Sequence, residues 1–234
     1  MAETQAQLLA DLALGCRILA HEGQGDLIWG HVSLRVPGAP NTFWLKGAAL
    51  GLEEITPTEI ITLDMDGNQL EGTANKHVEW PIHAGVLQAR PDLNCVVHTH
   101  AMHAVAFAAT GEPLRAVGHD GVRFSPPDVP RFTQTTSLII TPELGAAVAA
   151  ALGDRSAVFL RSHGVVVAGE SPQVAIALAV FLDRACELQL MAMSATGGRD
   201  YAYTPDDEAL EKRKTLLSTG SYRPLWEYYR RKLG

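Results

Sequence analysis

A short apolar run that carries two histidines does most to limit how this chain can fold. Residues Asn94–His100 read Asn-Cys-Val-Val-His-Thr-His, and their apolar and β-branched side chains are typical of a buried strand. Successive side chains of a strand point to opposite faces of a sheet, so His98 and His100 should project from the same face. Two imidazoles side by side are the beginning of a metal site, so the run predicts a sheet with chemistry at one strand end.

Two further residues extend this candidate site. His163 follows another apolar run, in Ser162-His163-Gly164. Glu79 lies before the run Asn94–His100, and most of a predicted helix separates the two. A carboxylate and three imidazoles form a plausible ligand set for a divalent metal. A histidine in apolar surroundings is also a common core residue, so spacing alone leaves the metal site and the structural interpretation both open.

The remaining pattern alternates short strands with helices. Period-2 stretches predict strands over 29–36, 43–47, 60–64, 69–71 and 94–100, and one strand that runs through 157–168. Apolar spacing predicts helices over 4–22, 77–90, 101–109, 141–152, 171–194, 205–216 and 222–232. The Gly- and Pro-rich segment 111–137 reads as a long loop. We find no repeat and no linker, which predicts one α/β domain over residues 1–234.

Composition narrows the class of protein. The net charge of −7 disfavours nucleic acid or an anionic membrane as a partner. The three cysteines, Cys16, Cys95 and Cys186, lie in apolar segments, as expected of buried thiols in a reducing compartment. The first residues lack the pattern of a signal peptide, and no run of about 18 apolar residues is present. We therefore expect a cytoplasmic protein without a membrane segment.

In combination, the motifs resemble the class II aldolase/adducin family. The resemblance lies in Gly30-His-Val-Ser33, in Glu79-Trp80 with His83, in the segment from Arg90 to His100, and in Ser162-His-Gly164. It implies a three-layer α/β/α sandwich with a mostly antiparallel central sheet. It also implies a divalent metal held by the three histidines, with Glu79 as a further ligand and as the catalytic acid, in a homotetramer.

Two departures from the sugar-phosphate aldolases concern the phosphate site. His77-Val78 occupy the place of a Ser-Ser pair, and His31 occupies the place of an asparagine. The Gly-His-x-Ser pattern resembles instead the branch that acts on aromatic ortho-hydroxy carboxylates. This resemblance implies a decarboxylase, with 3-hydroxy-2-methylpyridine-4,5-dicarboxylate of vitamin B6 degradation as the expected substrate and 3,4-dihydroxyphthalate as the alternative.

Several choices remain open on the sequence. A second substrate carboxylate needs a polar or cationic partner, for which His31, Lys46, His77 and Arg123 are the candidates. Imidazole ligands suit Zn²⁺, whereas the decarboxylase resemblance favours Mn²⁺. An aldolase or epimerase that acts on a sugar or sugar phosphate is a second interpretation, and a non-catalytic adducin-like interaction module is a third.

Overall fold

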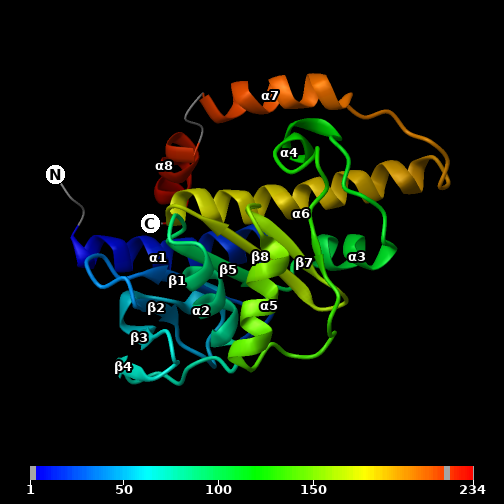
Figure 1. Ribbon diagram of the computed structural model, residues 1–234. Helices are drawn as coiled ribbons and strands as arrows, with labels where there is room; N and C mark the ends of the chain where they lie inside the picture. The colour runs from blue at the N-terminus through cyan, green and yellow to red at the C-terminus, as the bar shows by residue number, and fades with distance from the viewer. Residues whose placement is uncertain (1–3, 219–221, 234) are drawn as a thin grey trace.

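The chain folds around one mixed sheet. The computed structural model describes residues 4–218 and 222–233. Its eight strands lie in the order β4-β3-β2-β1-β5-β8-β7-β6, with helices on both faces (Figure 1). Neighbouring strands are antiparallel except for β6 and β7, which are parallel. The predicted α/β fold with a mostly antiparallel sheet is confirmed.

The strands are short and largely buried. Their bounds are β1 His31–Arg35, β2 Thr42–Lys46, β3 Ile60–Asp64, β4 Gln69–Glu71, β5 Cys95–Thr99, β6 Arg131–Phe132, β7 Ala157–Leu160 and β8 Gly164–Gly169. The single strand predicted over 157–168 was wrong, because β7 and β8 form a tight hairpin. Ser162 adopts a left-handed φ of 53°, and the His163 amide donates to the Leu160 carbonyl at 3.1 Å. The hairpin therefore puts His163 in a turn rather than within a strand.

The helices form the two outer layers. Their bounds are α1 Gln5–Leu19, continued by the π-helical turn η1 Ala20–Gln24, the 3₁₀ turns η2 Leu52–Glu54 and η3 Pro57–Glu59, α2 Trp80–Ala89, α3 Met102–Thr110, α4 Gly118–Val122, α5 Pro142–Leu152, α6 Pro172–Ala195, α7 Asp206–Ser218 and α8 Tyr222–Leu233. The side chains of Thr4, Thr141 and Ser171 cap α1, α5 and α6 by accepting from first-turn amides. Helices α1, α3 and α6 cover one face of the sheet, and α2 and α5 cover the other.

The pleat of β5 divides the interior into two apolar clusters. Cys95 and Val97 pack with the α1, α3 and α6 side, whereas Val96 packs with the α2 and α5 side. Because side chains alternate along a strand, His98 faces the same side as Val96. The strand thus directs His98 toward the N-terminal end of α2, where Glu79 lies.

Two further segments differ from the prediction. The helix predicted over 77–90 begins at Trp80, with Pro81 in its first turn and Glu79 as its N-cap residue. The Glu79 side chain makes no capping hydrogen bond, so its carboxylate remains available to the site. The predicted loop over 111–137 also contains α4 and the short strand β6, which hydrogen-bonds to β7.

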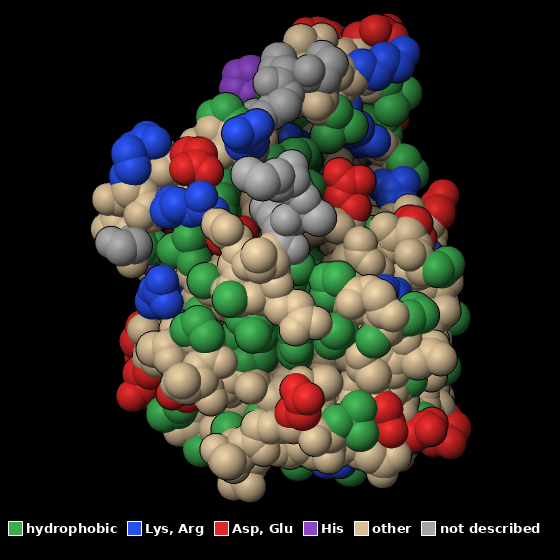
Figure 2. Space-filling view, turned by 90° about the vertical axis from the view of Figure 1, so that its left-hand side faces the viewer, with side chains coloured by type: hydrophobic (Ala, Val, Ile, Leu, Met, Phe, Trp, Pro, Cys, Tyr) green, Lys and Arg blue, Asp and Glu red, His purple; other side chains and the backbone are tan. Residues whose placement is uncertain are grey.

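The surface is charged unevenly. Figure 2 shows the face that lies on the left of Figure 1, where hydrophobic side chains gather across the middle. Lys, Arg, Asp and Glu side chains mix toward the top of this face, and acidic side chains lie at its lower rim. Within the described ranges, no helix has the combination of length and apolar character that crossing a bilayer requires.

Candidate metal centre

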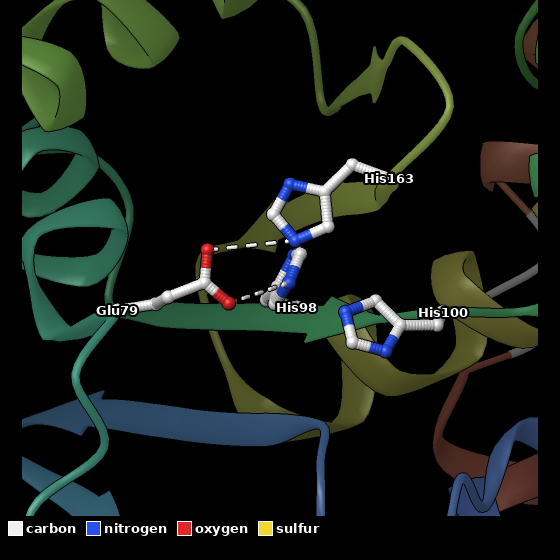
Figure 3. A group of neighbouring side chains, drawn as sticks. All are labelled: Glu79, His98, His100 and His163. Atoms are coloured by element: carbon white, nitrogen blue, oxygen red, sulfur yellow. Dashed lines mark ion pairs between the residues drawn. The ribbon is translucent and has the colours of Figure 1, made fainter. Parts of the chain in front are cut away.

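Four of the predicted site residues meet at one point of the sheet. One ligand atom from each of Glu79, His98, His100 and His163 lies within 4.8 Å of the others. Figure 3 shows how they converge: His98 from β5, His100 just beyond it, His163 from the β7–β8 turn and Glu79 from the start of α2. Elements that are distant in the sequence thus supply the four groups.

The hydrogen bonds of the imidazoles leave their Nε2 atoms toward the centre. His98 Nδ1 lies 3.0 Å from the Val165 carbonyl, which can only accept, so Nδ1 carries the proton. His100 Nδ1 lies 2.7 Å from Asp26 Oδ2, and this carboxylate also accepts. In the neutral form of each ring, the nitrogen that keeps a lone pair is therefore Nε2.

These Nε2 lone pairs test whether a metal fits the site. The Nε2 atoms of His98, His100 and His163 are buried and have no hydrogen-bond partner among the described residues. Leaving a buried polar atom unpaired costs free energy, so three in one place indicate a missing partner. A divalent cation bound by imidazole nitrogens satisfies all three, and the residues fit such an ion.

Glu79 completes the set. Its Oε1 accepts a hydrogen bond from the Ile139 amide at 2.8 Å and lies 3.4 Å from His163 Nε2, while its Oε2 lies 3.7 Å from His98 Nε2. Burial alone raises the pKa of Glu79, but the contacts with His163, His98 and the Ile139 amide lower it overall. Burial lowers the pKa of His98 to about 3, so this imidazole is neutral at pH 7, as a metal ligand must be.

A pocket opens beside the centre, and we call it the site pocket. Its volume is about 230 Å³, and it is lined by Asp26, Trp29, Gly30, His31, His77, Val78, Glu79, His100 and Leu138. A cavity of about 150 Å³ holds a benzene ring, so this pocket is large enough for one substituted ring. Gly30 has a φ of 78°, which only glycine adopts readily, and this turn leads into β1.

A hydrogen-bonded chain of three residues leads inward from the pocket wall, and we call it the histidine relay: His31, His83 and Ser33. His31 Nδ1 lies 2.6 Å from His83 Nε2, and His83 Nδ1 lies 2.7 Å from Ser33 Oγ. Antiparallel pairing of β1 with β5 sets His31 opposite His98, with ring centroids 5.0 Å apart. Burial lowers the pKa values of His31 and His83 well below the ordinary value, so both rings are neutral.

Of the four residues predicted to contact the substrate, two line the site pocket, one lies next to the pocket and one lies elsewhere. His31 and His77 line the site pocket, with ring centroids 4.5 Å apart. Lys46 lies behind His77, with Nζ 3.4 Å from His77 Nε2. The structure does not bring Arg123 to this group: its guanidinium stacks on Phe181 at 4.3 Å.

Sequence reasoning missed two groups that support the centre. Asp26 orients His100, yet in the sequence it is one polar residue of a Gly-rich loop. The Ile139 amide holds Glu79, and a backbone group gives no signal in a sequence. His103, which follows the His-x-His motif, contacts Asp183 and Glu187 and lies outside the centre.

Comparison with known proteins agrees with the geometry. A 3,4-dihydroxyphthalate decarboxylase from Arthrobacter keyseri is 34% identical over 219 residues, which cover 87% of this chain and 88% of that protein. Decarboxylase NovR from Streptomyces niveus is 30% identical over 232 residues, which cover 97% of this chain and 85% of that protein.

Solved structures and the family model point the same way. An aldolase II superfamily protein from Pseudomonas syringae superposes with a TM-score of 0.89 at 26% identity, covering 100% of this chain and 94% of the other. Residues 10–190 match the model of the Class II Aldolase and Adducin N-terminal domain. The chain belongs to the class II aldolase and adducin family.

Proposed function

We propose that this protein is a divalent-metal-dependent carbon–carbon lyase that decarboxylates an aromatic acid with a hydroxyl group ortho to the departing carboxylate. The observation that carries the proposal is a set of three buried Nε2 atoms that lack a hydrogen-bond partner among the described residues, with a carboxylate beside them and a pocket of one-ring size next to them. The decarboxylase names of two relatives support the same reaction class.

His98, His100 and His163 would hold the metal, with Glu79 as a fourth ligand before substrate binds. Mn²⁺ is the ion we propose, and Zn²⁺ is the alternative. A bound divalent cation stabilises negative charge that develops on the substrate hydroxyl oxygen. The neutral imidazoles leave the full charge of the ion in place, and Asp26 and the Val165 carbonyl fix two of the rings for this task.

Glu79 is the group that we propose to move the proton. As a carboxylic acid it would give a proton to the ring carbon that bears the departing carboxylate. The bond from that carbon to the carboxylate then breaks, its electrons return to the ring, and CO2 leaves. The ring keeps the proton, and Glu79 regains one from solvent. An anionic substrate raises the pKa of a neighbouring carboxyl, which favours the acid form at the required moment.

Two substrates fit this proposal, 3,4-dihydroxyphthalate and 3-hydroxy-2-methylpyridine-4,5-dicarboxylate. Both carry a hydroxyl and two carboxylates on consecutive ring carbons, and each has a single ring that suits a pocket of about 230 Å³. The name of one relative supports the first compound. We propose His31 and His77 as pocket contacts to this substrate, because both line the pocket.

We propose further that the chain assembles as a homotetramer. Trp29, Val78 and Leu138 line the site pocket and yet are 50%, 63% and 49% exposed. Apolar side chains gathered around a pocket mouth are typical of a surface that another chain covers. Light scattering on a size-exclusion column should give four times the mass of one chain, and a monomer would refute the assembly.

The test is CO2 release, with metal analysis on the same preparation. We expect metal-dependent CO2 from 3,4-dihydroxyphthalate or from the pyridine dicarboxylate, and no cleavage of fuculose 1-phosphate. Metal-loaded protein that cleaves only the sugar phosphate would establish the aldolase interpretation instead. Protein that binds no metal would favour an interaction module.

A further inference from the structure

Lys46 is a buried cation that lacks a carboxylate partner. Its side chain is fully buried at the end of β2, and its Nζ lies 3.2 Å from the Ile28 carbonyl and 3.4 Å from His77 Nε2. No carboxylate lies within ion-pair distance of this Nζ among the residues that the structure describes. A buried ammonium is costly unless it is paired, and burial lowers the pKa of Lys46 accordingly.

Other buried charged groups of the chain are compensated. Asp183 contacts His103 and accepts from the Ala104 amide at 2.9 Å. Asp11 pairs with Arg230 at 3.0 Å. Among the described residues, Lys46 Nζ has only the Ile28 carbonyl and the His77 ring within hydrogen-bond distance, and the charges of Glu53 and Glu54 act on it from beyond ion-pair distance. The fold therefore retains a positive charge at a place where it contributes little to stability.

The Lys46 ammonium contacts a residue at the wall of the site pocket. His77, which contacts Lys46, lines the pocket, and so does Trp29, the neighbour of Ile28. Lys46 itself does not line the pocket, and His77 is the pocket residue that its ammonium contacts. The metal-centre residues Glu79 and His100 line the same pocket.

We propose that Lys46, with His77 between it and the pocket, is the specificity determinant for a second carboxylate on the substrate. The proposal rests on the proposed function and deepens it. The departing carboxylate and the neighbouring hydroxyl of the substrate lie at the metal centre. The retained carboxylate sits at the His77 wall and supplies the counterion that Lys46 lacks. A substrate with only one carboxylate leaves the cation unpaired.

The experiment compares two ligands that differ by the retained carboxylate alone, 3,4-dihydroxyphthalate and 2,3-dihydroxybenzoate. Both Kd, by calorimetry, and kcat/KM for CO2 release are measured on Mn²⁺-loaded protein. The wild type should prefer the dicarboxylate, and Lys46→Met should reduce that preference by about 10- to 100-fold, the size expected when one unit charge no longer acts on a carboxylate across an intervening imidazole.

Two variants serve as controls. Lys46→Gln keeps a donor for the Ile28 carbonyl but removes the charge, so it should lose the preference as Lys46→Met does. Lys76→Met removes an exposed lysine whose Nζ contacts the Gly67 carbonyl, and it should keep the wild-type preference. Thermal unfolding verifies that each variant is folded.

The outcomes separate the two proposals. A wild type without preference, or a folded Lys46→Gln protein that keeps the full preference, overturns the role of Lys46. If the wild type releases no CO2 from either acid, the proposed function fails, and the Kd ratios still decide the role of Lys46. Because the wild-type ratio requires no variant, a Lys46 protein that fails to fold does not prevent the test.

Discussion

Two groups of histidines lie side by side on the same face of the sheet. They differ in what their ring nitrogens contact. In the metal-centre group, His98, His100 and His163, each Nε2 is buried without a hydrogen-bond partner among the described residues. In the histidine relay, His31 and His83 bond to each other, and His83 continues to Ser33. Ring centroids of His31 and His98 are only 5.0 Å apart.

The difference shows that a cluster of buried imidazoles is not in itself a metal site. What distinguishes a ligand set is the direction of its lone pairs and the absence of a protein partner for them. In the relay, His83 uses both ring nitrogens to contact His31 and Ser33, so we interpret the relay as a support for the His31 ring at the pocket.

The largest expected effect is the loss of metal binding, which should occur in the metal-centre group and not in the histidine relay. His98→Ala should abolish stoichiometric metal binding and reduce kcat/KM by on the order of 10³-fold or more, because it removes a ligand and the charge stabilisation that the metal supplies. His83→Leu, the matched change in the relay, should keep the metal. Metal analysis after dialysis measures both, and equal metal loss in the two variants would break the distinction.

Glu79→Gln should separate metal binding from turnover. The three imidazoles remain, so the protein should stay metal-loaded, whereas kcat should fall by about 10²- to 10⁴-fold with the loss of the general acid. A metal-replete variant with near-wild-type kcat would remove Glu79 from the proposed role.

Asp26→Asn should have an intermediate effect. The carboxylate fixes the His100 ring through a 2.7 Å contact, and loss of such an orienting group typically weakens metal affinity by about 10- to 100-fold. Competition with a metal chelator measures the affinity. Ser33→Ala at the end of the relay is the control, and it should leave the affinity unchanged.

The smallest expected effect concerns His103, which lies in neither group. Its hydrogen bond to Asp183 raises its pKa, so the folded state favours the charged ring. The contribution of the charged His103 ring to the free energy of unfolding is complete below the ordinary histidine pKa of about 6.5. It is lost as the pH rises through the raised pKa of the folded state. Since the side chain is 41% exposed, His103→Gln should cost only a few tenths of a kcal/mol more near pH 5.5 than near pH 9. Urea unfolding at both pH values measures this, and a cost that grows with pH would contradict it.

The layers of the fold and the metal centre could be predicted from the sequence more fully than the wall of the site pocket could. Alternation in Asn94–His100 predicts the shared face of His98 and His100, and apolar periodicity predicts the helices on both sides. The β7–β8 hairpin escaped prediction because the apolar runs before Arg161 and after Gly164 resemble two halves of one strand, and the turn between them depends on a left-handed Ser162. The burial of Lys46 and the bonding of His31 to His83 arise from tertiary packing, which local patterns do not encode.

An anomalous-scattering map from a crystal of the Mn²⁺-loaded protein tests the central claim most directly. We expect one peak per chain at about 2.0–2.3 Å from the Nε2 atoms of His98, His100 and His163, with Glu79 beside it. A peak on the His31 and His83 rings, or the absence of any peak at the four-residue cluster, would contradict the account.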